Sequence, residues 1–464
     1  MTERTTLKEK IGYGFGDAAS SMFWKIFTFY LAIFYTDVFG ISAAAVGTMF
    51  LVTRIWDTAN DPIMGVICDR TNSRYGKFRP YLLWIAVPFG IIGVILFTTP
   101  DFGLTGKLVY AYITYTLMMM AYTAINVPYA SLLGVMSGNS DDRTALASYR
   151  MVFAFGGSLL VVAIFQPLLD LFKMSFAVTT SYQLTMVVVG VLAVIFFMFT
   201  FLWTRERIKV PEDQDNNLKE DIKNLLKNAP WFILLGAGVM TLIFNSVRDG
   251  VSLYYFKYFI LDDTAVTFSK MTFAYSTVFI LLGQAFNMFG VMMAKPVSAK
   301  IGKRKTFLFA MLISAVLSSL FYICNRELVV LLFTLQALIS FCAGIIFPLL
   351  WSMYADTADY SELKTGRRAT GLVFSASSMT QKLGWTLGGS ITMWLLAFYG
   401  FKANIEQAPE TINGLKVMIS FIPAVAAMLS AAFIFFYQLS DKKVKEITEA
   451  LEAKREHVTQ SSNA

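Results

Sequence analysis

Two aspartates stand four residues apart within an apolar segment, in the stretch TRIWDTANDPIMG from Thr53 to Gly65. On a helix, Asp57 and Asp61 share one face with Arg54, which precedes Asp57 by three residues. Charged side chains at membrane depth are energetically expensive and normally face a cavity or a partner. Two carboxylates one helical turn apart repel each other in a low dielectric, and a bound proton or metal ion removes that repulsion. The pattern predicts a cation site, and the alternative is an ion pair between Arg54 and a neighbouring acid that locks helices together.

Sodium is a hard cation that prefers oxygen ligands, by the same reasoning that governs calcium and magnesium. Asn60 and Thr123 can add neutral oxygens to a site whose metal ligands are Asp57 and Asp61. A proton, in contrast, needs only the two carboxylates. Both coupling ions, Na+ and H+, therefore stay open, and no other cofactor is expected.

The segments that must position these residues are built for lipid. The chain of 464 residues is 56% hydrophobic and 15% charged, with a mean hydropathy of +0.58, whereas a soluble protein carries about 25% charged residues. Apolar runs of roughly 18 to 25 residues recur along it, and each can cross a hydrocarbon core about 30 Å thick as a helix. We predict an all-α membrane protein with about twelve transmembrane helices. The predicted spans lie near residues 12–38, 43–68, 80–99, 107–136, 145–172, 182–203, 230–259, 269–294, 304–323, 328–356, 369–399 and 412–439.

The longest polar stretch inside the chain, RERIKVPEDQDNNLKEDIKNLLKN, separates two sets of six spans. We expect an N-terminal six-helix bundle at 1–204, a cytoplasmic linker at 205–228, a C-terminal six-helix bundle at 229–440 and a cytoplasmic tail at 441–464. A weak internal repeat agrees with two related halves, because SAKIGKRKTFL from Ser298 repeats the small-basic-Gly-Lys pattern within DRTNSRYGKFRPYL from Asp69. Two parallel six-helix repeats are typical of the major facilitator fold, in which the substrate sits near mid-membrane between the halves.

Membrane topology, rather than nucleic-acid binding, explains the net charge of +8. Placing both termini in the cytoplasm puts about 27 of the 39 Lys and Arg residues on cytoplasmic segments and about seven outside. The charged N-terminus leads directly into a long first span, so we expect no removable signal peptide. One histidine, His457, and three scattered cysteines provide neither a metal site nor a catalytic triad, which argues against an enzyme.

A second group of polar residues falls on other predicted spans and is suited to binding a polar substrate. Trp24 can stack on a sugar ring, although an ordinary lipid-facing or core tryptophan explains it equally well. Asn126 offers both a donor and an acceptor, which suits hydroxyl recognition. The candidate substrate-binding residues are Ser21, Trp24, Lys25, Asn126, Arg150, Lys382 and Trp385.

The predicted spans also carry more basic residues than the aspartate pair needs, namely Lys25, Arg150, Arg248 and Lys382. One hypothesis is that the cavity accepts an anionic sugar such as a uronide. The equally plausible alternative is that these cations form structural pairs with Asp17 and Asp249.

A cluster of mixed charge ends the tenth predicted span, in YADTADYSELKTGRRATG from Tyr354. Asp141, Asp142 and Arg143 occupy the corresponding position after the fourth span. Salt bridges across the two halves would hold the inner side shut in one state, and a solvated loop with a positive-inside bias is the alternative. The residues expected to form this inner gate are Asp356, Asp359, Glu362, Arg368 and Arg143.

Five motifs give the chain a resemblance to a known family over essentially its whole length. They are YGFGD from Tyr13, YTDVFG from Tyr35, RIWDTANDPIMG from Arg54, GKFRPYL from Gly76 and ADTADYSELKTGRRATG from Ala355. Together they resemble the glycoside-pentoside-hexuronide:cation symporter family. The resemblance implies a monomeric, multi-pass protein of the bacterial inner membrane that carries a sugar together with a cation by alternating access.

The same resemblance implies roles for individual residues. It places the cation on Asp57 and Asp61 with Asn60 and Thr123, and Asn60 matches the asparagine of relatives that use sodium. It also places two cations at or beside the sugar and cation pathway, namely Arg150 and Lys382.

Three positions depart from the best-known family member, the bacterial melibiose permease. Ser21 and Asn126 stand where that permease has aspartates that hold galactoside hydroxyls, and Ala130 stands where it has a tryptophan. These changes argue against α-galactosides and leave xylosides, glucosides and uronides open. A uniporter, which would not need Asp57 and Asp61, and a non-transporting sugar sensor of the same fold are the alternatives to a symporter.

Overall fold

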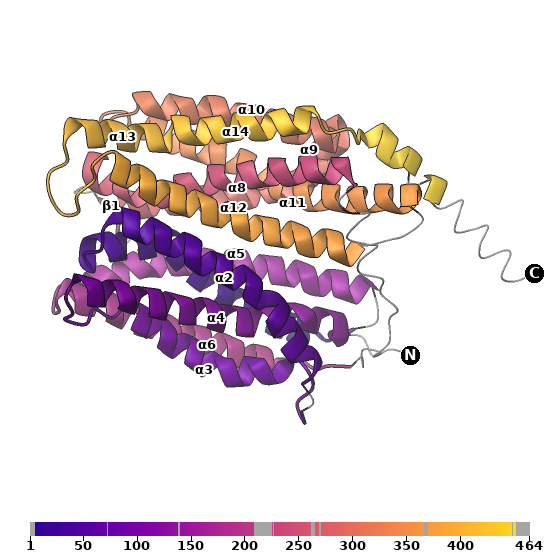
Figure 1. Cartoon of the computed structure of the whole chain (residues 1–464), viewed down its shortest axis with the longest axis horizontal. Helices are drawn as coiled ribbons and strands as arrows, with labels where there is room; N and C mark the ends of the chain where they lie inside the picture. The colour runs from indigo at the N-terminus through magenta and orange to yellow at the C-terminus, as the bar shows by residue number, and fades with distance from the viewer. Residues whose placement is uncertain are drawn as a thin grey trace, which may run out of the picture. The chain divides into compact units, whose positions relative to one another are not determined.

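The computed structural model describes residues 5–71, 73–137, 140–207, 225, 227–260, 265–268, 271–365, 370–447 and 449–451. Long helices dominate this part of the chain (Figure 1). In chain order the elements are α1 (Leu7–Ile26), π-helical turns at Phe27–Leu31 and Phe34–Val38, α2 (Ala43–Asp69), α3 (Arg79–Leu96), α4 (Leu104–Met136), α5 (Ser140–Lys173), α6 (Val178–Trp203), α8 (Ala229–Tyr255), a π-helical turn at Phe256–Ile260, β1 (Ala265–Phe268), β2 (Met271–Ala274), α9 (Tyr275–Ile301), α10 (Lys303–Leu320), a 3-10 turn at Phe321–Ile323, α11 (Val329–Thr365), α12 (Thr370–Phe398), α13 (Pro409–Ile419) and α14 (Phe421–Phe435).

Every predicted span coincides with helix over most of its length, so the all-helical membrane architecture is confirmed. Within the described residues, nine helical segments are long and apolar enough to cross a membrane. The helices α1, α2 and α12 are not among these nine, and each carries charged residues of the candidate site. The full number of spans therefore stays a prediction.

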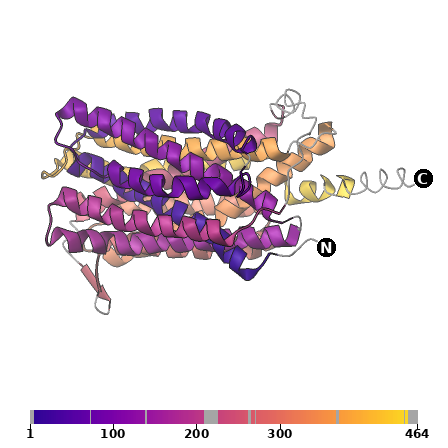
Figure 2. The same cartoon turned by 90° about the horizontal axis from the view of Figure 1, so that it is seen from below.

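The eighth predicted span begins later than expected. Residues Ala265–Phe268 and Met271–Ala274 pair as an antiparallel hairpin in front of α9, with Ala265 opposite Ala274 (Figure 2). Both strands, AVTF and MTFA, contain β-branched or aromatic residues that favour strands over helices. The span therefore starts at Tyr275 rather than near 269.

The last predicted span is interrupted at Ser420, between α13 and α14. Pro423 explains the break, because it has no N–H for the carbonyl of Ile419, four residues earlier. The carbonyl of Ile419 receives a hydrogen bond from Arg248 of α8 instead, at 3.2 Å.

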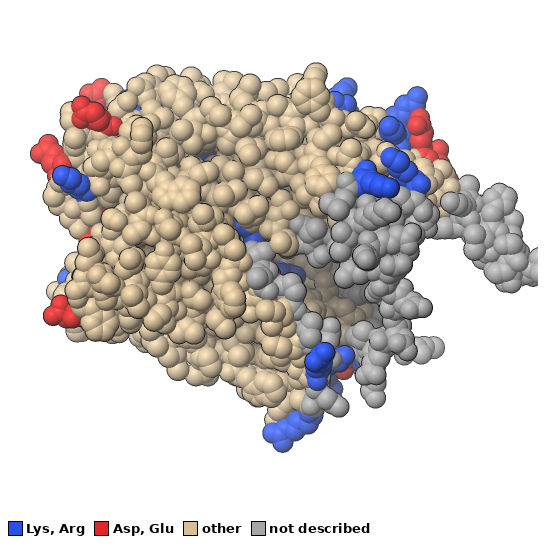
Figure 3. Space-filling model, viewed as in Figure 1, with Lys and Arg blue, Asp and Glu red and all other residues tan. Residues whose placement is uncertain are grey.

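Apolar side chains cover much of the outer surface of the helices. Val152 is 68% exposed on α5, Val316 is 62% exposed on α10 and Val330 is 82% exposed on α11. On the face drawn in Figure 3, Lys, Arg, Asp and Glu gather toward the helix ends, and other residue types cover most of the middle. A soluble monomer rarely exposes such a continuous apolar surface, whereas lipid favours it.

The chain forms two compact units, each built from several stretches of sequence. The first unit comprises Met1–Asp213, Ser252–Gln284 and Ser390–Gly414, and the second comprises Gln214–Val251, Ala285–Gly389 and Leu415–Ala464. In the first unit α1 packs closely on α5, because a Cβ at Gly157 would lie only 2.7 Å from the Cα of Ala18. In the second unit α9 and α11 approach in the same way, where a Cβ at Gly290 would lie 3.1 Å from the Cα of Gly344. Small residues at these crossings are typical of helix packing in membranes.

An acidic side chain binds the start of the third helix in the first unit. The carboxylate of Glu206, which follows α6, accepts the backbone N–H groups of Lys77, Phe78 and Arg79 at 2.8 to 2.9 Å. These groups lie at the N-terminal end of α3, where backbone donors have no partner within the helix and where negative charge is favoured. Gly76, at φ 107°, lets the chain turn around the carboxylate.

The second unit repeats this arrangement. Asp441, which follows α14, accepts the backbone N–H of Lys303 at 2.9 Å, and the preceding Gly302 has φ 89°. Arg304 donates to the carbonyl of Phe435 at the end of α14, as Arg79 donates to the carbonyl of Phe201 near the end of α6. This geometry agrees with the weak internal repeat seen in the two loops.

Replacing Glu206 by alanine should destabilise the protein, because three backbone donors at the start of α3 lose a charged acceptor. We expect the free energy of unfolding to fall by about 2 kcal/mol, measured as a lower melting temperature in detergent. Glu446→Ala is a matched control, since Glu446 is 61% exposed and 4.0 Å from Lys442. Equal melting temperatures for Glu206→Ala and the wild type would contradict this role.

Candidate functional site

Two helices of the first unit bring the predicted cation ligands together. Asp57 and Asp61 lie on successive turns of α2, and Thr123 of α4 faces them. The Thr123 Oγ1 lies 2.9 Å from the Asp57 Oδ1 and 2.9 Å from the Asp61 Oδ1. Asp57 is 2% exposed and Thr123 is 1% exposed, whereas Asp61 is half-buried.

The hydroxyl of Thr123 has one proton and can donate it to only one of the two carboxylates. The second carboxylate at 2.9 Å then faces the hydroxyl oxygen without a proton between them. A proton on that carboxylate or a cation held among the three oxygens removes this repulsion. The cluster is therefore chemically suited to bind a cation, as the spacing of Asp57 and Asp61 predicts.

Arg54 contacts Asp57 but has other partners as well. Its Nη1 lies 3.7 Å from the Asp57 Oδ2, while its Nε donates to the Tyr115 hydroxyl at 3.2 Å. The guanidinium also lies over the Trp24 ring, 4.6 Å from its centre. The ion pair with Asp57 is long for a charge-assisted hydrogen bond, so it does not replace a cation at this carboxylate.

Two neutral residues on α2 lie close to the aspartates in sequence. Asn60 is half-buried on the turn between them. Thr53, which sequence reasoning missed, precedes Asp57 by one turn, is 2% exposed and has a buried hydroxyl without a hydrogen-bond partner among the described residues. Thr53 could have been predicted to lie beside Asp57, because it stands four residues before it on the same helix face.

Asn126 is held by Ser20, the neighbour of the candidate substrate contact Ser21. The Ser20 Oγ donates to the Asn126 Oδ1 at 2.7 Å, and the Asn126 Nδ2 donates to the carbonyl of Tyr122 at 3.0 Å. A carbonyl can only accept, so the amide nitrogen must face Tyr122 and the amide oxygen must face Ser20. This orientation leaves the second N–H of Asn126 as its donor, while Ser21 lies half-buried beside the pair.

Arg150 of α5 pairs with Asp17 of α1. The Arg150 Nε donates to the Asp17 Oδ2 at 2.8 Å, and the guanidinium lies 5.3 Å from the ring centre of Tyr129. Tyr129 in turn stacks on Tyr13, with ring centres 4.8 Å apart. The structure thus shows the pairing with Asp17 that was the alternative to a sugar contact.

Arg248 is buried inside the second unit and has neutral partners there. It is 6% exposed and donates to the Gln336 Oε1 at 2.6 Å and to the carbonyl of Ile419 at 3.2 Å. The carbonyl end of α13 carries partial negative charge, which stabilises the guanidinium. Arg248 therefore provides a hydrogen bond to the end of α13, where the last predicted span is interrupted.

The remaining substrate candidates occupy two helix faces. Lys25 lies in the last turn of α1, 5.4 Å from the ring centre of Phe29. Lys382 and Trp385 are half-buried and three residues apart on α12, and the carbonyl of Trp385 accepts a hydrogen bond from Ser246 at 3.0 Å.

The residues expected at the inner gate are only partly described. Asp356 of α11 binds Lys303 at the start of α10, at 2.8 and 3.0 Å, within the second unit. Asp359 and Glu362 are half-buried on the following turns of α11. Arg368 and the side chain of Arg143 lie outside the described residues. Sequence reasoning missed Lys303, although the pattern GKRK marked its loop.

Comparison with known proteins gives a consistent result. A family model described as MFS/sugar transport protein matches residues 12–441. The chain is 36% identical over 447 residues to YagG of Escherichia coli (strain K12), described as a candidate glycoside/cation symporter, with 96% of this chain and 95% of that protein covered. It is 32% identical over 444 residues to the isoprimeverose transporter of Lactiplantibacillus pentosus, with 95% and 90% covered. A solved bacterial homolog of the human lysosomal transporter Spinster superposes with a TM-score of 0.68 at 14% identity, with 93% of this chain and 95% of that chain covered.

Proposed function

The chain belongs to the MFS/sugar transport protein family, and from this premise we propose that it carries a sugar across a bacterial inner membrane together with a cation. The family match and the superposition confirm the major facilitator fold that the repeat predicted. They also confirm the resemblance to the glycoside-pentoside-hexuronide:cation symporters and the expectation of a transporter rather than an enzyme.

The observation that carries the proposal is the contact of two carboxylates with one hydroxyl. The buried Asp57 and the half-buried Asp61 both approach Thr123 at 2.9 Å, which is unfavourable without a proton or a metal ion. Such an arrangement is unnecessary in a uniporter or a sensor. Half-buried Asn60 supplies the neutral oxygen that favours sodium over a proton.

Coupling follows if the sugar binds well only after the cation has neutralised the carboxylates. Arg54 connects the two sites, since it contacts Asp57 and also lies against Trp24, a candidate sugar-stacking residue. A cation at Asp57 changes the charge that Arg54 faces and thereby the position of Trp24. The linkage is reciprocal, so the sugar must also raise the affinity for the cation.

We propose a neutral glycoside or pentoside as the substrate class. Two of the four cations that suggested an anionic sugar, Arg150 and Arg248, are hydrogen-bonded within the protein. Ser20 and Asn126 form a neutral pair that presents an N–H donor, which suits a hydroxyl or ring oxygen. The relative described as an isoprimeverose transporter supports testing that sugar first.

The proposal keeps the predicted organisation. Both termini are cytoplasmic, the protein is a monomer, and bundles at 1–204 and 229–440 alternate access to the sugar. Lys382 and Trp385 on α12 are the sugar contacts proposed from the second half.

Binding of a sugar panel to the purified protein tests this function. The panel holds isoprimeverose, xylosides, glucosides, galactosides and uronides, each measured by calorimetry with and without sodium at pH 5.5 and pH 7.5. We expect sodium to tighten binding of one neutral class by about tenfold, a coupling of about 1.4 kcal/mol. Tightening by low pH alone would assign the coupling ion to the proton. Selective uronide binding would overturn the neutral class, and binding that ignores both cations would favour the uniporter.

A further inference from the structure

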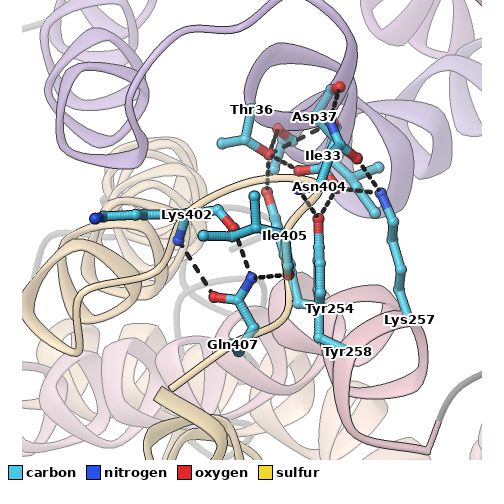
Figure 4. A network of polar contacts seen from close by, with 11 residues as sticks. Ile33, Thr36, Asp37, Tyr254, Lys257, Tyr258, Lys402, Asn404, Ile405 and Gln407 are labelled. Atoms are coloured by element: carbon cyan, nitrogen blue, oxygen red, sulfur yellow. Dashed lines mark hydrogen bonds and ion pairs between the residues drawn. The ribbon is translucent and has the colours of Figure 1, made fainter. Parts of the chain in front are cut away.

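A closed network of polar contacts surrounds Asp37, in the π-helical turn Phe34–Val38 of the first unit (Figure 4). The side chain of Asp37 is 3% exposed, whereas that of its partner Lys257 is 41% exposed. One carboxylate oxygen accepts from Lys257 and from the Tyr258 hydroxyl, and the other accepts from Thr36 at 2.6 Å. Tyr254 lies 2.9 Å from Thr36 and extends the chain of hydroxyls.

The loop between α12 and α13 closes this network through one residue. The Asn404 Nδ2 donates to the carbonyl of Asp37, its Oδ1 accepts from Lys257 at 2.9 Å, and its backbone N–H donates to the Tyr258 hydroxyl at 3.0 Å. Asn404 has φ 59°, a conformation that asparagine tolerates better than most residues. The side-chain amide and the backbone N–H of Asn404 therefore all form hydrogen bonds with Asp37, Lys257 or Tyr258.

Hydrogen bonds within the loop hold its conformation independently of Asp37. Gln407 donates to the carbonyls of Lys402 and Ile405 at 2.6 and 2.7 Å, and it accepts from the Lys402 N–H at 3.3 Å (Figure 4). Preorganisation lowers the entropy lost when the loop docks.

Helices α2 and α12 meet closely beside the same network. A Cβ at Gly47 would lie 2.9 Å from the Cβ of Met393, and the Trp394 Nε1 donates to Thr48 at 3.4 Å. Met393 also receives the Tyr254 hydroxyl at 4.0 Å, which joins this contact to the network around Asp37. The close approach packs α2 directly against α12 at this end.

We propose that Asp37, Lys257, Tyr258 and Asn404 form an outer latch that closes the pathway on the external side and must open to admit the sugar. The inference rests on the proposed function, because alternating access requires such a barrier and the proposed topology places this end outside. The latch joins a segment of the N-terminal half to two segments of the C-terminal half, up to 367 residues apart. Opening exchanges each contact for water, so the difference in free energy between the closed and open states stays small enough for a gate.

Accessibility of a buried cysteine tests the latch without any sugar. Ser390→Cys on α12 is the reporter, since Ser390 is 0% exposed and three residues before Met393 on the same helix face. The reporter is placed in a chain whose Cys68, Cys324 and Cys342 are changed to serine, in intact cells, and is labelled by a membrane-impermeant thiol reagent. We expect Asn404→Gly and Asp37→Asn each to raise the labelling rate by about tenfold, because each removes two or more hydrogen bonds from the closed state.

Asn404→Gly is the cleaner variant, because glycine tolerates the positive φ and the change lies in an exposed loop. Asp170→Asn is the matched control, since Asp170 pairs with Lys173 at 3.3 Å within α5 and belongs to no latch. Asp170→Asn should leave the labelling rate unchanged. The double variant Asp37→Lys/Lys257→Asp keeps one charge of each sign in the pair. Its labelling rate should lie closer to the wild-type rate than that of Asp37→Asn.

Unchanged labelling in both Asn404→Gly and Asp37→Asn, with wild-type melting temperatures, would overturn the latch. The result is independent of the sugar panel, because the reporter needs no bound sugar or cation. If the wild-type protein binds none of the sugars but Asn404→Gly and Asp37→Asn still raise the labelling rate about tenfold, the latch is retained and the proposed substrate is lost.

Discussion

Asparagine in place of Asp57 should abolish the cation dependence of sugar uptake. The substitution keeps the size of the side chain and removes the charge that the proposed cation requires, 2.9 Å from the Thr123 hydroxyl in the wild type. A hydrogen bond to a charged group in such a buried site contributes about 1.5 to 3 kcal/mol, so cation affinity should fall about 100-fold. The measurement is uptake of the preferred sugar into membrane vesicles, with sodium or pH gradients imposed in turn.

Two further variants, both at Thr123, distinguish loss of a cation ligand from loss of structure. Thr123→Ser keeps the hydroxyl that both carboxylates approach and should retain coupling, whereas Thr123→Val should lose it. Melting temperatures near the wild-type value would show that the variants are folded. Stimulation by sodium or by low pH that survives in Asp57→Asn would refute the cation assignment and leave Asp57 as a structural partner of Arg54.

The proximity of Asp57 and Asp61 could be predicted because it depends on local sequence. Asp57 and Asp61 stand one helical turn apart, so helical geometry places them on one face before any tertiary contact is known. Thr123 came from the family resemblance and from its oxygen chemistry, and the structure places it 2.9 Å from both carboxylates. The helices themselves could be predicted because apolar runs of this length have one stable arrangement in lipid.

Contacts between distant segments could not be predicted from the sequence. Asp37 and Lys257 are 220 residues apart, and no periodicity relates them. The contact between Ser20 and Asn126 was not predicted, because it depends on how α1 and α4 are rotated, and adjacent side chains on a helix diverge by about 100°. The sequence suggested a cavity position for Arg248 from its charge alone. Its partner, the carbonyl of Ile419, is available as an acceptor because Pro423 has no N–H to donate to it.

Ser20 and Asn126 also show how a neutral pair can stand where an acid would accept hydrogen bonds. A carboxylate at the position of Asn126 would accept hydrogen bonds from sugar hydroxyls, whereas the oriented amide uses its oxygen on Ser20 and offers an N–H. An amide N–H needs an acceptor on the substrate, whereas a carboxylate needs a donor.

Loss of Arg150 should have the second large effect, and a double variant should reveal its cause. Arg150→Gln leaves Asp17 as a half-buried carboxylate without its 2.8 Å partner, and the side chain of Asp17 is only 17% exposed. We expect the free energy of unfolding to fall by about 2 kcal/mol, a smaller loss than for a fully buried pair because the side chain of Arg150 is 34% exposed. Sugar binding should weaken in parallel, because the pair fixes α5 against α1.

Adding Asp17→Asn to Arg150→Gln removes the unpaired charge and should restore most of the stability, as measured by melting temperature in detergent. If Arg150 only positions α1 and α5, sugar affinity should recover together with stability in the double variant. If Arg150 touches the sugar, affinity should stay low although the melting temperature recovers. Asp17 and Arg150 contact each other directly and are less exposed than Asp170 and Lys173. The coupling free energy from a double-mutant cycle should therefore be larger for Asp17 and Arg150 than for Asp170 and Lys173.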